Sequence, residues 1–288
     1  MPALGRAAGV RIGSVDAVVL EASADDVARR SVEDEPWALD LAVRALELTA
    51  LERSATPGRA QSLCGAAARS TPPLAAVCVR TGLVAACREW LRGTGVRLAA
   101  ATSALPPDLM VAEAARAVAL GAEEIEVPLD CEAFLCGRHA AVYEEIAQVR
   151  EAVGDAVLRV SLGTDELGTY DDVRRASLLA ILAGADFLVA GERPGSAAGA
   201  LPTGLCVLQA IRDVHDAAGR AVGFASAACA GGAEEATRLP LLVRETLGPD
   251  WLTPQRFRIA FPGLLDDLLP RLREQRTGVF AGRDALVV

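Results

Sequence analysis

The sequence predicts an α/β protein, namely a (β/α)8 TIM barrel with an N-terminal extension. Short apolar runs rich in β-branched residues alternate with Ala- and Leu-rich stretches of helical period. The alternation occurs eight times, and eight strand–helix units close naturally into a barrel of about 250 residues. An open doubly wound sheet is the structural alternative, and it ranks second because no glycine-rich dinucleotide fingerprint follows the first strand.

The elements follow one another in regular order. The predicted strands are residues 45–51, 74–80, 96–102, 124–129, 156–162, 187–192, 221–227 and 256–261. The predicted helices, which carry apolar residues at three- and four-residue spacing, are residues 59–68, 83–91, 108–120, 139–153, 171–183, 203–218, 234–246 and 263–275. Residues 1–36 contain an acidic stretch and little periodicity, so we predict a partly irregular arm or cap there, with the barrel over residues 37–288.

The fourth strand shows how such a barrel would be lined. Ile125, Val127 and Leu129 share one face, which suits packing on the outer helices, whereas Glu124 and Glu126 share the other. The glutamates would then point into the barrel, where an unpaired carboxylate is costly. Glu126 lies nearer the C-terminal end of the strand, where barrel enzymes have their active sites.

Composition limits the classes of function. The net charge of −9 argues against nucleic-acid binding, which needs a basic face. No apolar run is long enough to span a membrane, and no signal peptide is evident. The seven scattered cysteines suit free thiols in a reducing cytoplasm, where we expect the protein to act.

Lysine is absent from the sequence, so all 29 residues counted as Lys and Arg are arginine. A GC-rich genome explains most of such a bias. Chemistry that needs a lysine would nevertheless keep one, and no side chain here can form a Schiff base with a carbonyl substrate.

Five motifs in register resemble the deoxyribose-phosphate aldolase family over about residues 46–280. They are Ala76-Val77-Cys78-Val79, Gly121-Ala122-Glu123-Glu124-Ile125-Glu126-Val127, Asp165-Glu166-Leu167-Gly168-Thr169, Ala183-Gly184-Ala185-Asp186-Phe187-Leu188 and Val222-Gly223-Phe224. The tail, with Leu247-Gly248-Pro249-Asp250-Trp251-Leu252, Phe257-Arg258-Ile259 and Thr277-Gly278, resembles the longer form of that enzyme. The resemblance implies a TIM barrel, Schiff-base aldol chemistry on a phosphorylated sugar, and frequent dimers.

The resemblance also places the site residues, and this chain departs from the family there. Val189 stands where the family has its Schiff-base lysine on strand six, and Ala225 where a second lysine tunes the first. Glu126 replaces the acid/base aspartate of strand four, and Arg159 matches a lysine on strand five. Glu47 matches the aspartate of strand one.

The family's phosphate cradle, which the resemblance places after strands seven and eight, has changed as well. Ala228-Cys229 replaces a Gly-Gly pair, although Gly231-Gly232 could serve instead. Ala260-Phe261-Pro262 replaces Gly-Ala-Ser, and Pro262 has no N–H to donate. We therefore expect a pocket that no longer prefers a phosphorylated sugar.

The predicted catalytic residues are Glu126, as a general acid/base, with Arg159 and Glu47. Arg159 would orient Glu126 or hold an oxyanion, but Glu47 and Arg159 could equally form a structural ion pair, and Glu126 could be structural too. The predicted substrate-binding residues around them are Thr49, Cys78, Thr164, Val189, Glu192, Arg193, Ala225 and Ser226. Cys78 could instead be a small core residue, and Glu192 and Arg193 could be solvated turn residues.

No metal or other cofactor is predicted. The spacing Cys131-x4-Cys136-x2-His139 fits no standard structural zinc pattern, and the chain has only one further histidine, His215.

Two hypotheses of function remain open. The first is a repurposed enzyme in which Glu126 and Arg159 perform acid/base chemistry on an unphosphorylated small molecule: carbon–carbon cleavage, cyclisation, dehydration or isomerisation. The second is a non-catalytic barrel that acts as a scaffold, a partner subunit or a small-molecule sensor. A homodimer is compatible with either hypothesis.

Overall fold

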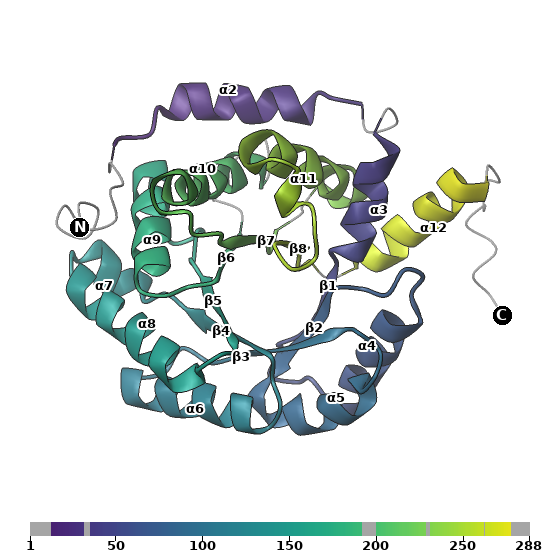
Figure 1. Cartoon of the computed structure of the whole chain (residues 1–288), viewed down its shortest axis with the longest axis horizontal. Coiled ribbons are helices and arrows are strands. Elements are labelled where there is room, and N and C mark those ends of the chain that lie inside the picture. The colour runs from purple at the N-terminus through teal and green to yellow at the C-terminus, as the bar shows by residue number, and fades with distance from the viewer. Residues whose placement is uncertain (1–12, 32–34, 192–199, 229–230, 262, 278–288) are drawn as a thin grey trace.

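The structure is a computed structural model that describes residues 13–31, 35–191, 200–228, 231–261 and 263–277. It contains one eight-stranded parallel sheet in which the strands lie side by side in chain order (Figure 1). The strands are β1 Glu47–Ala50, β2 Ala76–Arg80, β3 Arg97–Ala101, β4 Glu124–Pro128, β5 Val157–Ser161, β6 Phe187–Ala190, β7 Gly223–Ser226 and β8 Phe257–Ile259.

The sheet closes on itself between its first and last strands. Leu46 forms a parallel bridge with Ile259, whose backbone N–H donates to the Ala45 carbonyl at 3.0 Å. The predicted TIM barrel is therefore confirmed, and the open doubly wound sheet is wrong, because such a sheet would leave both edge strands unpaired.

Helices surround the barrel as the periodicity predicted. They are α4 Pro57–Arg69, α5 Val84–Leu91, α6 Pro107–Ala119, α8 His139–Val153, α9 Tyr170–Leu182, α10 Leu201–Ala218, α11 Gly232–Leu247 and α12 Leu264–Thr277. Three short elements carry too few residues to show a period: α7 Cys131–Leu135 and the 3-10 turns Thr81–Leu83 and Pro249–Trp251.

Side-chain caps begin several of the helices that follow strands. Thr169 accepts a hydrogen bond from the Asp172 N–H at 3.1 Å, and Asp130 accepts one from the Ala133 N–H at 2.8 Å. Such caps satisfy N–H groups that have no partner within the helix. They fix where each strand ends and its helix begins, and so they fix the loops at the C-terminal mouth of the barrel.

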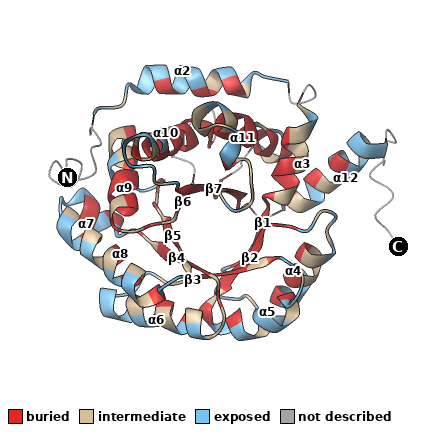
Figure 2. Ribbon diagram, in the orientation of Figure 1, coloured by how far each residue is buried: buried red, intermediate tan, exposed pale blue. Residues whose placement is uncertain are grey.

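The main hydrophobic core lies between the strands and the helices (Figure 2). Ile125 and Val127 of β4 are fully buried in this layer, as the alternation predicted. A separate, smaller apolar cluster of Phe187, Val189 and Ala225 lies on β6 and β7. Because successive residues of a strand face opposite sides of a sheet, this second cluster lies inside the barrel.

The N-terminal segment contains the helix α2 Ala17–Ala28, which lies across the outer face of α10 and α11 (Figure 1). The Val15 N–H donates to the Asp171 carboxylate at 2.6 Å, and the Tyr170 hydroxyl donates to Glu21 at 3.1 Å. The next helix, α3 Pro36–Arg44, packs on α11 and α12 and leads into β1. The described part of residues 1–36 therefore packs against the helical ring.

Among the helices that the structure describes, none combines the length and the apolarity that crossing a bilayer would require.

Candidate active site

The interior of the barrel holds a cluster of charged side chains from four strands. Glu47 comes from β1, Glu124 and Glu126 from β4, Arg159 from β5 and Arg258 from β8. Each occupies an inward position because its strand neighbours face the helices. Glu47, Glu124, Arg159 and Arg258 are at most 1% exposed, so nearly every charge in the cluster must be paired within the protein.

Arg159 is the centre of the cluster. Its Nη2 donates to Glu47 Oε1 at 2.8 Å and lies 2.8 Å from Glu126 Oε2. Its Nη1 donates to the other oxygen of Glu47 and, at 3.3 Å, to Glu124 Oε2. Although burial lowers the pKa of the Arg159 guanidinium, Glu47 and Glu126 raise it well above its usual value, so Arg159 stays charged. Both terminal nitrogens of Arg159 are therefore engaged by carboxylates.

Arg258 and Glu124 form a second pair in this cluster. Arg258 donates to both oxygens of Glu124, at 2.9 and 2.6 Å, and to Glu47 at 3.2 Å. Arg97 of β3 reaches Glu124 as well, from a side chain that is 34% exposed. Sequence reasoning placed Glu124 inside the barrel but gave neither arginine a role. The sequence could have indicated the inward position of Arg258, because this charged residue lies between the apolar Phe257 and Ile259 of a barrel strand.

The two carboxylates of β4 have opposite acidities. Burial by itself would raise the pKa of Glu124, but the positive charges of Arg258 and Arg159 outweigh that effect and lower the pKa to about 2. Burial also raises the pKa of Glu126, and Arg159 offsets this only in part because Glu47 and Glu124 oppose it, so the pKa of Glu126 stays above its usual value. The Glu126 side chain is 14% exposed, which makes it the accessible carboxylate of the cluster. Of the three carboxylates in the cluster, Glu126 is therefore the one best suited to exchange a proton.

Cys78 of β2 lies beside this carboxylate. Burial, with the charges of Glu126 and Glu47, raises the pKa of its thiol well above the usual value, so the residue is a neutral thiol rather than a thiolate nucleophile. Among the described residues, the donor atoms of Glu47, Cys78 and Glu126 lie within 4.8 Å of one another, close enough to share a metal ion. Arg159 already bridges the two carboxylates, however, and supplies the positive charge that such an ion would bring.

The β6–β7 side of the interior is apolar. Val189 and Ala225 are paired in register on neighbouring strands and are 2% and 0% exposed. They pack with Phe187, whose ring centroid lies 6.0 Å from the Arg159 guanidinium carbon and 5.6 Å from that of Arg258. The ring fits against β7 because residue 223 is glycine, where any Cβ would overlap it.

The other predicted mouth residues have varied surroundings. Thr49 is half-buried and paired in register with Cys78. Thr164 is buried and accepts a hydrogen bond from the Gly191 N–H at 2.9 Å, and Ser226 is buried and donates to the Ala228 carbonyl at 2.7 Å. Glu192 and Arg193 lie outside the described residues. The structure thus brings Glu47, Arg159 and Glu126 together, with Cys78 beside them.

The cysteine–histidine motif after β4 forms no metal-binding group among the residues described. The Cys131 thiol donates to the Leu162 carbonyl at 3.4 Å, and the His139 ring packs on Phe134 at 4.9 Å between centroids. Cys136 is exposed. Of the two thiols, only that of Cys131 is buried.

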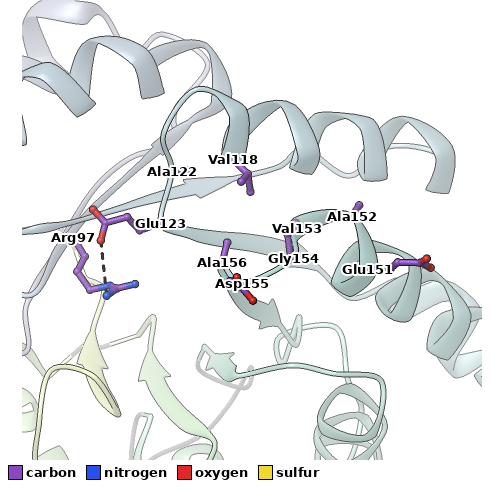
Figure 3. A pocket seen from close by; sticks show the side chains of 10 residues that line it. All are labelled: Arg97, Val118, Ala122, Glu123, Glu151, Ala152, Val153, Gly154, Asp155 and Ala156. Carbon is purple, nitrogen blue, oxygen red and sulfur yellow. Dashed lines mark ion pairs between the residues drawn. The ribbon is translucent and has the colours of Figure 1, made fainter.

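A groove of about 650 Å³ lies at the opposite end of the barrel (Figure 3). The loops that precede β4 and β5 line it, so it opens at the N-terminal ends of the strands. Arg97 and Glu123 face each other there at 3.8 Å. Active sites of TIM barrels lie at the C-terminal ends of the strands, so this groove is not the candidate active site.

A closed parallel barrel with a charged cluster inside and an accessible carboxylate toward its mouth has the architecture of the TIM-barrel enzymes. Comparison with known proteins narrows this class. No family profile matches the chain. Deoxyribose-phosphate aldolase of Mus musculus is 33% identical over 92% of this chain and 91% of its own length.

Solved structures share the fold. A structure from Toxoplasma gondii, described as a deoxyribose-phosphate aldolase, superposes with a TM-score of 0.73 at 22% identity, over 86% of this chain and 98% of its own. The tetrameric deoxyribose phosphate aldolase from Aeropyrum pernix has a TM-score of 0.59 at 16% identity, over 88% and 99%. The identity of 33% to the mouse enzyme over 92% of this chain shows that the chain belongs to the deoxyribose-phosphate aldolase family.

Proposed function

We propose that this protein is an acid/base enzyme of the family that works without a Schiff base. An imine intermediate needs a nucleophilic amine, and the sequence contains no lysine. The two positions at which the resemblance places lysines are Val189 and Ala225, which pack against each other in the apolar cluster. The reaction would therefore use other groups, among which Glu126 is the accessible carboxylate.

Glu126 is the proposed catalytic residue, and its setting is the observation that carries the proposal. It combines partial exposure with a pKa raised by burial, and its Oε2 lies 2.8 Å from Arg159 Nη2. A carboxyl in this setting can accept a proton from a ligand or return one. A carboxyl whose pKa approaches the working pH performs both steps efficiently.

Arg159 and Glu47 are proposed to position Glu126 rather than to touch the substrate. Both terminal nitrogens of Arg159 are held by carboxylates, and Glu47 accepts from both Arg159 and Arg258. This arrangement fixes the side chain of Glu126 and tunes its acidity. Replacing Glu47 by Gln should then move the pH profile of any activity to lower pH, because the charge of Glu47 is one cause of the raised Glu126 pKa.

The substrate is proposed to be an unphosphorylated carbonyl compound with an apolar portion that contacts the β6–β7 side. Carbon–carbon cleavage, cyclisation, dehydration and isomerisation of such a compound each involve proton transfers that a carboxyl group can perform. The cytoplasmic site of action and the homodimer are part of this proposal, and light scattering of the purified protein tests the dimer.

The experiment is a comparison of Glu126→Gln with the wild type. A thermal-shift screen of unphosphorylated ketones and aldehydes selects ligands, and NMR in D2O then follows deuterium exchange at the carbon next to the carbonyl. We expect exchange to fall by about 10²- to 10⁴-fold in Glu126→Gln. Glu151→Gln, an exposed acid of the distant groove, is the control and should keep full activity. Full activity in Glu126→Gln would refute the assignment.

One observation favours the non-catalytic alternative. The carboxylates of Glu47 and Glu124 pair with the terminal nitrogens of Arg159 and Arg258, so most of the charge in the cluster is balanced without a ligand, although the buried Nε of Arg159 has no hydrogen-bond partner among the described residues. A scaffold or sensor would bind ligands in the screen without catalysing exchange, and Glu126→Gln would then change neither property. The same experiment therefore separates the two functions.

A further inference from the structure

Arg80 is the last residue of β2, at the end of the strand that faces the mouth of the barrel. Val77 and Val79 are buried in the core between the strands and the helices, whereas Cys78 faces the charged cluster inside the barrel. The backbone of Arg80 is still extended, with φ −71° and ψ 150°. Because side chains alternate between the two faces of a strand, Arg80 lies on the inward face with Cys78, one step nearer the mouth.

The guanidinium of Arg80 differs from the other partly buried guanidinium groups in the described ranges. Its side chain is half-buried, yet it takes part in no ion pair and no hydrogen bond with the residues that the structure describes. Each of the other described arginines that are not fully exposed has such a partner. Arg97 pairs with Glu124, for example, and Arg220 donates to the Ile181 carbonyl.

The acid bonded to the next residue does not neutralise this charge. Glu113 of α6 accepts a hydrogen bond from the Thr81 hydroxyl at 3.0 Å and another from the Ser103 N–H at 3.1 Å. Both of its carboxylate oxygens are therefore engaged by other groups. A positive charge without a counter-charge in the described chain is attractive to an anionic group that enters the mouth.

A row of register partners connects Arg80 to the proposed catalytic residue. Arg80 pairs with Ala101 of β3, and Ala101 pairs with Glu126 of β4. Neighbouring strands lie about 4.8 Å apart, so the backbones of Arg80 and Glu126 are separated by about 10 Å. The residue between them has only a methyl group as its side chain, so the two longer side chains flank the space above it. A short molecule in this space can contact both.

We propose that Arg80 is a specificity-determining residue that binds a carboxylate of the substrate, so that the substrates are short oxo acids whose carbonyl lies beside Glu126. The inference rests on the proposed function, because it assigns the second end of the molecule on which Glu126 acts. A guanidinium suits this role, since its planar fork binds a carboxylate through two parallel hydrogen bonds. The subsite lies at β2, away from the phosphate cradle that the resemblance places after strands seven and eight.

The test compares binding with and without each of the two charges. The probes are the linear oxo acids pyruvate, acetoacetate and levulinate, and their amides are neutral controls of nearly the same shape. Dihydroxyacetone phosphate tests the other common anionic group. Arg80→Gln removes the proposed partner, and Arg116→Gln, at an exposed arginine in the last turn of α6, is the matched control. NMR titrations at constant ionic strength give the dissociation constants.

We expect at least one of the oxo acids to bind the wild type and Arg116→Gln equally, and Arg80→Gln to bind it about tenfold more weakly. Its amide should bind all these proteins as weakly as the acid binds Arg80→Gln. Equal binding of the acid by the wild type and Arg80→Gln, or no binding of any oxo acid to the wild type, would overturn the proposal. Tighter Arg80-dependent binding of dihydroxyacetone phosphate would overturn the carboxylate as the recognised group. If Arg80→Gln fails to fold, the comparison of acid with amide on the wild type decides.

These outcomes are separate from catalysis. Glu126→Gln keeps Arg80, so it should bind the oxo acid at least as tightly as the wild type while deuterium exchange is lost. Arg80-dependent binding together with full exchange in Glu126→Gln would support the carboxylate subsite and refute the proposed catalytic role. Loss of exchange in Glu126→Gln together with unchanged binding by Arg80→Gln would refute the subsite alone.

Discussion

The two sides of the barrel interior differ in how they are filled. The β6–β7 side is lined by Phe187, Val189 and Ala225 and carries no charge, whereas β1, β4, β5 and β8 contribute five charged side chains. The charged side is stable only because its groups pair with one another, since an unpaired buried charge is costly. The apolar side contains no buried charge among these residues, so it needs no such pairing. The carboxylates and guanidinium groups named here thus all lie on the charged side, and the proposed chemistry depends on that side.

The largest effect is expected when an amine is introduced on the apolar β6–β7 side. Val189→Lys places an amine at the position where the resemblance expects the Schiff-base lysine, and burial lowers the pKa of an amine, which makes it nucleophilic. Incubation with a small aliphatic aldehyde and sodium borohydride should then give a stable adduct on residue 189, found by peptide mass mapping. The wild type cannot give a lysine adduct because it has no lysine.

Arg88→Lys is the control for this gain. Arg88 is 51% exposed, so its replacement is a solvated, protonated amine and should be modified far more slowly. Equal modification of the two variants would show that the interior position has no special reactivity.

The next effect concerns the pairing on the charged side. Arg159→Met leaves Glu47 and Glu126 without their shared cation, and we expect the free energy of unfolding at neutral pH to fall by about 3–5 kcal/mol. Urea denaturation measures it. Arg88→Met breaks only the exposed pair with Glu123 and should cost about 1 kcal/mol or less. Similar losses of unfolding free energy in both variants would mean that the charged residues of the cluster do not depend on Arg159 for their stability.

A smaller loss of stability is expected from a substitution at Gly223, which lies against the Phe187 ring between the apolar side and the two arginines. Gly223→Ala forces the Phe187 ring away from β7 and toward the two buried arginines, which should cost about 1–3 kcal/mol of stability. Adding Phe187→Leu to this variant should recover part of the loss, because it relieves the overlap. Gly82→Ala has open space around its Cβ and serves as the control. An unchanged unfolding midpoint in Gly223→Ala would contradict the close packing.

The smallest effect is the pH dependence of Glu126. Its folded pKa lies above the usual value of 4.5, so the folded state holds this proton more tightly, and stability falls as pH rises from 4.5 through the folded pKa. Glu126→Gln lacks this dependence, so its free energy of unfolding should rise relative to that of the wild type as the pH increases from 4 to 8. Urea denaturation at several pH values measures the difference.

Glu124, on the same strand, should show the opposite pH dependence of stability. Its folded pKa of about 2 lies below 4.5, so its contribution to stability is present above pH 4.5 and is lost as pH falls toward 2. Glu124→Gln should therefore lose stability relative to the wild type as pH rises through that range. Parallel stability curves for the two variants would show that the carboxylates do not differ.

Local patterning predicted much of this molecule. The eight strands and their helices lie within a few residues of the predicted ranges, because each element shows its own period of apolar residues. The inward direction of Glu124 and Glu126 follows from the alternation along β4. Helix α2 was not predicted, because only Leu20, Ala24 and Val27 of its residues are buried and the pattern is correspondingly weak.

Periodicity, motifs and composition are properties of the chain alone, and they were enough to predict a barrel of this family without an imine-forming lysine. Which charges meet depends instead on the folded structure. Arg258 reaches Glu124 across 134 residues, and Glu235 reaches Ala200 across 35. Such pairings depend on barrel closure and loop positions, and the resulting acidity of Glu126 depends on burial and on the charges around it, none of which a local pattern encodes.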